Sequence, residues 1–160
     1  MNTQPTTQAS PLARLFASRQ HLAGPILRLT LAVVMFPHGA QKLLGWFGGY
    51  GFQGTLGFLT ESIGLPWILA CGIILLEFFG PLLLLIGLGT RLVALGMAGL
   101  MVGAITTVHA PFGFFMNWSG AQAGEGFEYH LLVIGIGLAL ATLGSGKFAL
   151  DRKLAARDPQ

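Results

Sequence analysis

The sequence predicts an all-α fold, a polytopic membrane protein built around a four-helix transmembrane bundle. Its 160 residues are 53% hydrophobic and only 9% charged, whereas soluble domains carry roughly a quarter charged residues. The apolar residues fall in four stretches, and each approaches the roughly 20 residues that a helix needs to cross about 30 Å of hydrocarbon. The 24 glycines also suit helices that pack closely within a bilayer. A water-soluble domain is therefore not the expected class.

The chain begins with a polar tail, residues 1–22. This tail lacks the apolar core and the small-residue cleavage site of a signal peptide, so we expect it to remain on the mature protein. Ser10 and Pro11 are typical of a helix start, and the apolar residues that follow fall near one helical face. Two interpretations stay open: a short helix lying on the membrane surface, or a frayed tail with too little apolar area to bind alone.

The four-helix domain is expected over residues 23–155, followed by a short C-terminal tail, residues 156–160. We predict its membrane spans at four ranges: 25–44, 66–87, 91–109 and 129–143. An even number of spans places both termini on one side of the membrane. Only Lys42 among the lysines and arginines lies near the opposite side, so the positive-inside rule predicts cytoplasmic termini.

The two predicted outer loops, residues 45–65 and 110–128, mix glycine with aromatic residues. Such segments are apolar enough to lie at the membrane interface but too rich in glycine to span it as helices. We expect them to cap the bundle as lids. Trp46, Trp67 and Trp118 would then form an outer aromatic belt, an interpretation that we favour over their lining a ligand pocket.

Glu77 is the acidic residue that lies deep within a predicted span, about 15 Å from either end of it. An ion at this depth costs about 2.5 to 3.5 kcal/mol even on a lenient insertion scale, so the carboxylate should face the protein interior and pair. The first span supplies cations, because Arg28, His38 and Lys42 lie along one stripe of it. From their depths we expect Glu77 to bind His38 or Arg28, with Lys42 closing the outer end of the stripe.

Small residues and one proline predict how the helices pack. Pro37, inside the first span, lacks a backbone N–H and frees a carbonyl of the preceding turn beside the polar stripe. Gly99 and Gly103 form a GxxxG face in the third span, and Gly135 and Ala139 offer a similar surface in the fourth. We expect these surfaces to pack within one molecule rather than to form a dimer seam, although a homo-oligomer stays open.

A second polar group is predicted at the outer end, where His109 ends the third span and Glu128 and His130 begin the fourth. With His38 below them, three of the four histidines lie on one side. A metal ion would need such groups within about 2 Å of one point, and nothing in their spacing enforces that convergence. We therefore predict no metal site.

Several classes of function have no support in the sequence. No serine or cysteine nucleophile with a base and an orienting group is visible, and the glycine runs match no nucleotide-binding pattern. Cys71 has no partner in the chain, which excludes an internal disulfide. The basic residues lie in short tails and loops rather than in one patch, which argues against a nucleic-acid partner. The expected partner is the lipid bilayer.

Several separated motifs give the chain a resemblance to the DoxX family of four-span membrane proteins over about residues 23–154. They are Arg28, PHGAQKL at 37–43, Glu77, GLGTR at 87–91, GFF at 113–115, GFEY at 126–129 and GSGKFALD at 144–151. The resemblance implies a compact four-helix domain in the bacterial inner membrane, some of whose relatives are subunits of quinone-linked oxidoreductases acting on sulfur compounds. The family's recurring polar positions map onto Arg28, Gly39, Lys42, Glu77, Glu128 and Tyr129, without an assigned catalytic role.

Two functions are expected from these observations. The first is a redox-associated membrane subunit that binds a quinone or similar ring beside Arg28, His38, Lys42 and Glu77, where donors and proton carriers meet apolar walls. No electron-carrying cofactor is encoded, so electrons would have to come from a partner redox enzyme or another ligand. The second is a non-catalytic assembly, binding or transport component in which the buried ion pair is structural.

Overall fold

The computed structural model describes residues 21–156, which fold into helices joined by turns and short loops. The four long helices are α2 (Ala23–Leu44), α4 (Trp67–Ile86), α5 (Thr90–Ala104) and α6 (Glu128–Leu143). Each begins within two residues of a predicted span, and three of them also end there. The third continues beyond Ala104 as a π-helical turn, η3 (Ile105–His109), and a short 3-10 helix, η4 (Ala110–Phe112).

Three of these helical segments are long and apolar enough to cross a membrane, namely 23–44, 67–86 and 90–112. The fourth, α6, is equally apolar in character but has 16 residues, which at about 1.5 Å per residue is shorter than the hydrocarbon core. The outward faces carry large exposed apolar side chains, for example Val33, Ile68 and Leu132. A polytopic helical membrane protein is the architecture that accounts for such a surface.

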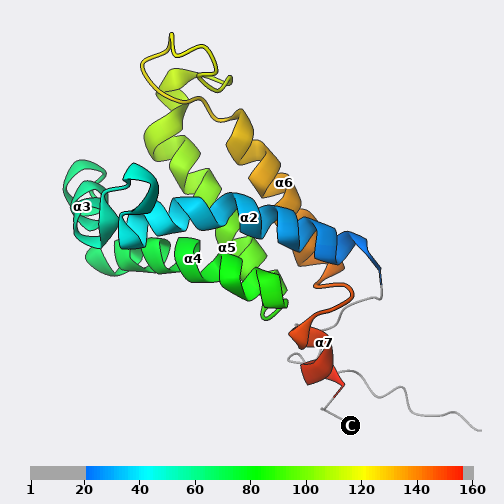
Figure 1. Cartoon of the computed structure of the whole chain (residues 1–160). Helices are drawn as coiled ribbons and strands as arrows, with labels where there is room; N and C mark the ends of the chain where they lie inside the picture. The colour runs from blue at the N-terminus through cyan, green and yellow to red at the C-terminus, as the bar shows by residue number, and fades with distance from the viewer. Residues whose placement is uncertain (1–20, 157–160) are drawn as a thin grey trace, which may run out of the picture.

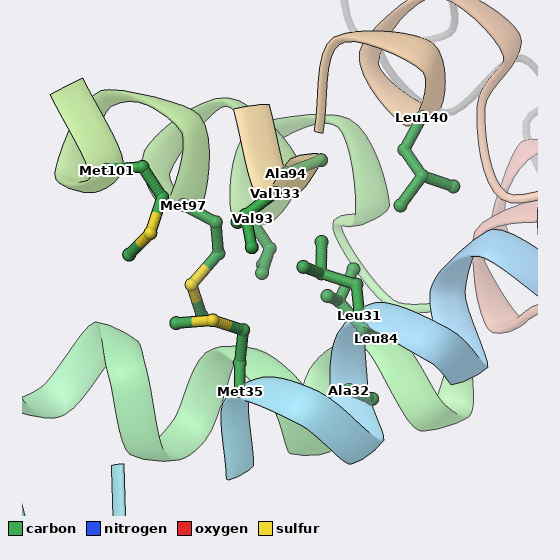
Figure 2. Packing of buried hydrophobic residues seen from close by; sticks show 10 residues of the cluster. All are labelled: Leu31, Ala32, Met35, Leu84, Val93, Ala94, Met97, Met101, Val133 and Leu140. Atoms are coloured by element: carbon green, nitrogen blue, oxygen red, sulfur yellow. The ribbon is translucent and has the colours of Figure 1, made fainter. Parts of the chain in front are cut away.

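The helices associate in two pairs, because α2 lies along α4 and α5 packs against α6. Figure 1 shows the second pair running at a steep angle to the first. The core lies where the pairs meet, and Figure 2 shows Met35 of α2 pointing toward Met97 of α5, with Leu31 and Leu84 beside them. We call the end that holds the turn between α4 and α5 and the segment after α6 the inner end, and the opposite end the outer end. These buried apolar side chains hold the pairs together toward the inner end.

The segment after α6 closes this inner end by binding to the ends of three helices. The guanidinium of Arg28 donates to the carbonyls of Leu84, Ser145 and Lys147, at 2.8, 2.9 and 3.0 Å. Asp151, in α7 (Leu150–Ala155), accepts from the backbone N–H groups that begin α5, those of Gly89 and Thr90. Arg28 and Asp151 therefore satisfy backbone groups that the helix ends leave unpaired.

The first outer loop folds over the outer ends of α2 and α4, as Figure 1 shows for α3. It consists of the 3-10 helix η1 (Trp46–Gly48), α3 (Gly51–Gly57) and the π-helical turn η2 (Phe58–Ser62). Gly45 begins the reversal with a φ of 74°, a left-handed conformation that glycine adopts without strain. The second loop also bends back, and the backbone N–H groups of Phe127 and Glu128 donate to the carbonyls of Gly113 and Phe114.

The prediction for the GxxxG face was wrong. A Cβ added at Gly99, Gly103 or Gly135 would meet nothing within 4 Å. The close approach between α5 and α6 lies instead at Gly137, where a Cβ would meet the Ala94 carbonyl and the Ala98 methyl. Helix α5 thus uses its small-xxx-small face at 94 and 98, and a motif alone does not say which face meets a neighbour. The expected interfacial helix at 10–22 lies, apart from its last two residues, outside the described residues.

Candidate functional site

A cavity of about 590 Å³ lies between the α2–α4 pair and the α5–α6 pair. Its volume falls within the range of about 300 to 1,000 Å³ that is usual for small-molecule sites. Most of its lining residues are apolar or glycine. The ionisable side chains that helices contribute to the lining come from α2, α4, η3 and α6; they are His38, Lys42, Glu77, His109, Tyr129 and His130. Five of the seven predicted site residues therefore line one cavity.

An ion pair between Lys42 and Glu77 forms the polar end of this cavity. The Lys42 Nζ lies 2.9 Å from Glu77 Oε1, and the two side chains are 31% and 3% exposed. The second carboxylate oxygen, Oε2, is buried and has no hydrogen-bond partner among the described residues. The carboxylate therefore keeps one acceptor for a ligand or a water, and the lysine keeps donors on its exposed side.

Glu77 pairs with Lys42, so the expected partners, His38 and Arg28, were wrong. The cause is the register of the two helices. Gly39 lies level with Glu77, since a Cβ at 39 would overlap the Glu77 carbonyl. Helix α2 ends five residues beyond Gly39, whereas α4 extends ten residues beyond Glu77 toward the same end. The depths predicted for His38 and Arg28 require α2 and α4 to end at the same level. Their outer ends instead differ by about five residues, or about 7.5 Å.

Arg28 and His38 are consequently assigned to different places. Arg28 lies eleven residues before Gly39, about 16 Å toward the inner end, where it binds carbonyls and does not line the cavity. His38 lines the cavity and faces Tyr129, with 5.9 Å between ring centroids. The Tyr129 hydroxyl lies 3.4 Å from the sulfur of Met35. Tyr129 thus bridges α6 to α2 across one side of the cavity.

Two of the three predicted outer residues meet. The rings of His109 and His130 are 4.1 Å apart, centroid to centroid, and both line the cavity. His109 Nδ1 is 2.8 Å from the Glu125 carbonyl, and the His130 side chain is buried. Glu128 is separate, because its carboxylate accepts from the N–H of Met116 and from Trp118 Nε1 and so holds the second outer loop.

The remaining expectations concern metals and tryptophans. Within residues 21–156, no group of three histidine, cysteine, aspartate or glutamate side chains is arranged to hold a metal ion. Trp46, Trp67 and Trp118 are exposed by more than half, and none of the three lines the cavity. Their positions fit the expected outer belt better than a pocket wall.

Two contacts between distant segments were not predicted from the sequence. Tyr129 was noted as a recurring family position, but its bridge to Met35 and His38 depends on how α6 crosses α2. Asp151 ends the GSGKFALD motif, and the only signal for its role was an acidic residue in a glycine-rich segment after the last span. A capping role for a residue 61 positions away from its helix is not readable from local pattern.

The sequence is similar to one protein family and to several proteins of bacteria. The sequence model of the family described as DoxX matches residues 25–110. "Putative oxidoreductase CatD" of Bacillus subtilis (strain 168) is 36% identical over 126 residues, which cover 79% of this chain and 82% of that protein. "Inner membrane protein YqjF" of Escherichia coli (strain K12) is 34% identical over 110 residues, 69% of this chain and 79% of that protein.

A third relative is an uncharacterized protein of Haemophilus influenzae, 30% identical over 128 residues, with 79% of each chain covered. No solved structure matches this chain significantly. Residues of the motifs that carry the resemblance make specific contacts in the structure. Arg28 binds carbonyls at the inner end, Gly39 packs against Glu77, and Lys42 and Tyr129 line the cavity. With the family model covering more than half of the sequence, the chain belongs to the DoxX family.

Proposed function

We propose that this DoxX-family protein is a redox-associated subunit of the bacterial inner membrane that binds a quinone-like molecule in the cavity. One observation carries the proposal: an apolar cavity of about 590 Å³ is lined by the Lys42–Glu77 ion pair, whose carboxylate is buried and has a spare oxygen. Apolar walls with a few convergent polar groups are typical of sites for small amphipathic rings.

The donor set fits a quinone. A quinone presents two carbonyl oxygens that accept hydrogen bonds, and its ring prefers apolar or aromatic neighbours. Lys42 can donate to one carbonyl from the cavity's polar end. His38, Tyr129 and His130 offer donors farther along the same cavity, and their rings can flank a flat ligand.

The chain's own residues would bind the ring and move protons. A bound quinone would supply the electron-accepting chemistry. Glu77 Oε2 and the histidine rings are ionisable groups that line the cavity where a reduced carbonyl oxygen would take up protons. Electrons would come from a partner redox enzyme or a second substrate, so this protein would be at most one subunit of an oxidoreductase. The printed name of the Bacillus relative supports an oxidoreductase context, and that of the Escherichia relative supports the inner membrane.

A specific observation favours the second candidate, a non-catalytic component whose ion pair is structural. Lys42 and Glu77 join α2 to α4 directly beside the tight crossing at Gly39. Polar contacts of this kind hold transmembrane helices in register without any ligand.

Ligand binding to matched variants separates the two candidates. The purified protein is extracted for quinone, and a water-soluble benzoquinone analogue is titrated against wild type, Lys42→Gln, Glu77→Gln and Glu61→Gln. Glu61 is the control, an exposed residue of η2 that does not line the cavity. We expect saturable binding that weakens by about tenfold or more in the first two variants, because each loses a charged hydrogen-bonding group at the ligand.

The control should bind as wild type does. No saturable binding by wild type, combined with a lower melting temperature in the Lys42 and Glu77 variants, would overturn the proposal and favour the structural role.

A further inference from the structure

We infer that the ligand of the cavity carries an apolar chain and arrives sideways from the bilayer, through an opening between α4 and α5. This inference rests on the proposed function for the polar head of the ligand. It adds the class of the ligand, a membrane-dissolved amphiphile with a hydrocarbon tail rather than a water-soluble solute, and it assigns the route that such a ligand takes.

The opening begins where contact between α4 and α5 ends. Near the 87–90 turn the helices pack closely, and a Cβ at Gly80 would collide with Met97 and one at Gly96 would crowd Leu76. Farther along, the facing positions are glycines, which we call the portal glycines: Gly72 of α4 with Gly99 and Gly103 of α5. All three are exposed, all three line the cavity, and a Cβ at any of them meets nothing within 4 Å. The cavity is therefore open, between α4 and α5, to the side of the molecule that faces the lipid.

Side chains narrow the other approaches. Tyr129 reaches Met35 and lies against His38, which joins α6 to α2 on the opposite side. Buried Met97 and Leu31 fill the inner end. At the outer end, α3 and η2 and the second outer loop supply lining residues, among them Thr55, Phe58 and Met116. Between α4 and α5, by contrast, the cavity is lined by the portal glycines, which have no side chains to narrow it.

The chemistry along the portal suits hydrocarbon. Its neighbours among the lining residues are Leu69, Ile73, Leu100 and Ala104. The hydroxyl of Thr107, at the outer edge, donates to the Gly103 carbonyl and so presents little free polarity. An ion or a strongly hydrated solute would have to shed water here, whereas an alkyl or isoprenoid chain loses nothing.

The polar pair lies at the other end of this path and at the right depth. Glu77 is ten residues from the start of its helix and nine from its end, about 13 to 15 Å from either end and so near the middle of the span. A head group held there by Lys42 and Glu77 is therefore surrounded by the hydrocarbon layer. Its tail can extend through the portal glycines into the bilayer without crossing a polar surface.

Filling the portal tests the inference. The variants are Gly99→Leu, Gly103→Leu and the double variant, and Gly135→Leu on α6 is the control because it is also exposed and uncrowded but does not line the cavity. Leucine has a higher helix propensity than glycine, so folding is not expected to suffer. Two probes are titrated into protein in nanodiscs, a decyl-substituted benzoquinone and the same ring without the tail.

For the double variant we expect the affinity for the tailed ring to fall by about tenfold or more, because the two leucine side chains occupy the space through which the tail would extend. The tail-less ring should change by less than about twofold, and Gly135→Leu should behave as wild type. Equal losses for both probes, or no loss for either, would overturn the portal. Absence of binding of both rings to wild type would instead overturn the proposed function.

A second measurement judges the portal without any quinone. The protein is placed in vesicles that contain a phospholipid with a photoreactive diazirine near the end of one acyl chain, and the labelled residues are mapped. Labelling of the cavity residues Met101 and Tyr129 in wild type, lost in the double variant, supports the inference. Labelling confined to outward residues such as Val102, with none in the cavity, contradicts it.

Discussion

At the scale of single residues, Gly39 and Glu77 explain each other. A helix pair can place a carboxylate at mid-membrane only if a cation reaches it, and Lys42 does so because the backbones of α2 and α4 nearly touch one turn away. The glycine brings the helices together, and the lysine stem spans the remaining gap. Gly39, Lys42 and Glu77 thus form one physical unit rather than three independent sites.

The first prediction concerns Gly39→Ala, which should destabilise the protein by about 1 to 3 kcal/mol because the added methyl has no space beside the Glu77 carbonyl. Heat denaturation in detergent measures the effect. Gly135→Ala is the control, since its methyl meets nothing and alanine is the better helix former by about 1 kcal/mol. Equal melting temperatures for the two variants would show that α2 and α4 do not cross at Gly39.

At the scale of helices, the inner end depends on contacts between segments far apart in sequence. Helix α4 ends and α5 begins within a few residues, so unpaired carbonyls and unpaired N–H groups lie side by side. Arg28 binds the carbonyls and Asp151 binds the N–H groups. The Asp151 N–H in turn donates to the Gly87 carbonyl, which fixes α7 against the turn.

The second prediction concerns this cap. Asp151→Ala should lower the free energy of unfolding by about 0.5 to 2 kcal/mol, because two N–H groups at the start of α5 lose their acceptors. Asp151→Asn should cost less, since one oxygen remains. Chemical denaturation in mixed micelles would measure both. A larger loss for the asparagine than for the alanine variant would contradict the capping role.

The positions of the helices along the sequence could be predicted, whereas the way in which they pack against one another could not. Span length is set by bilayer thickness, so hydropathy alone placed α2, α4 and α6 within two residues. Register is set by where two backbones fit together, which Gly39 decides against Glu77 and no local pattern reveals. The same limitation explains why Gly99 and Gly103 were assigned to a helix contact and instead line the cavity.

The candidate site was predictable in composition but not in pairing. A costly charge inside a span identifies Glu77, and helical spacing identifies the basic stripe. Which stripe member reaches the acid depends on depth differences of about one or two turns, the size of the register error. His38, one residue from Gly39, therefore points to Tyr129 and leaves Glu77 to Lys42.

At the scale of the whole molecule, two helix pairs are joined at the inner end and separated toward the outer end. The core around Met97 and the contacts of Arg28 and Asp151 lie on the inner side. The cavity occupies the space that the pairs leave as they diverge, and the first outer loop with α3 covers part of it. The packed core and the cavity therefore lie at opposite ends of the fold. If the cavity binds a ligand as proposed, substitutions at the portal glycines should weaken binding with little effect on folding.

The distribution of lysine and arginine between the two ends predicts the orientation of the protein in the membrane. Among the described residues, Lys and Arg lie on the inner side except for Lys42, and Glu77 already pairs with that lysine. Within residues 21–156, the outer end therefore has no unpaired lysine or arginine that would disfavour its transfer across the membrane. The other described lysines and arginines lie at the inner end, including Arg152 and Lys153 of α7. By the positive-inside rule, α7 should face the cytoplasm and the two outer loops the opposite side.

The last prediction tests this orientation with single cysteines in a Cys71→Ala background. Ser119→Cys, exposed in the second outer loop, should react with a membrane-impermeant maleimide on intact spheroplasts. Lys153→Cys, exposed on α7, should react only after the membrane is permeabilised. The reversed pattern would contradict the predicted orientation and would turn the two outer loops toward the cytoplasm.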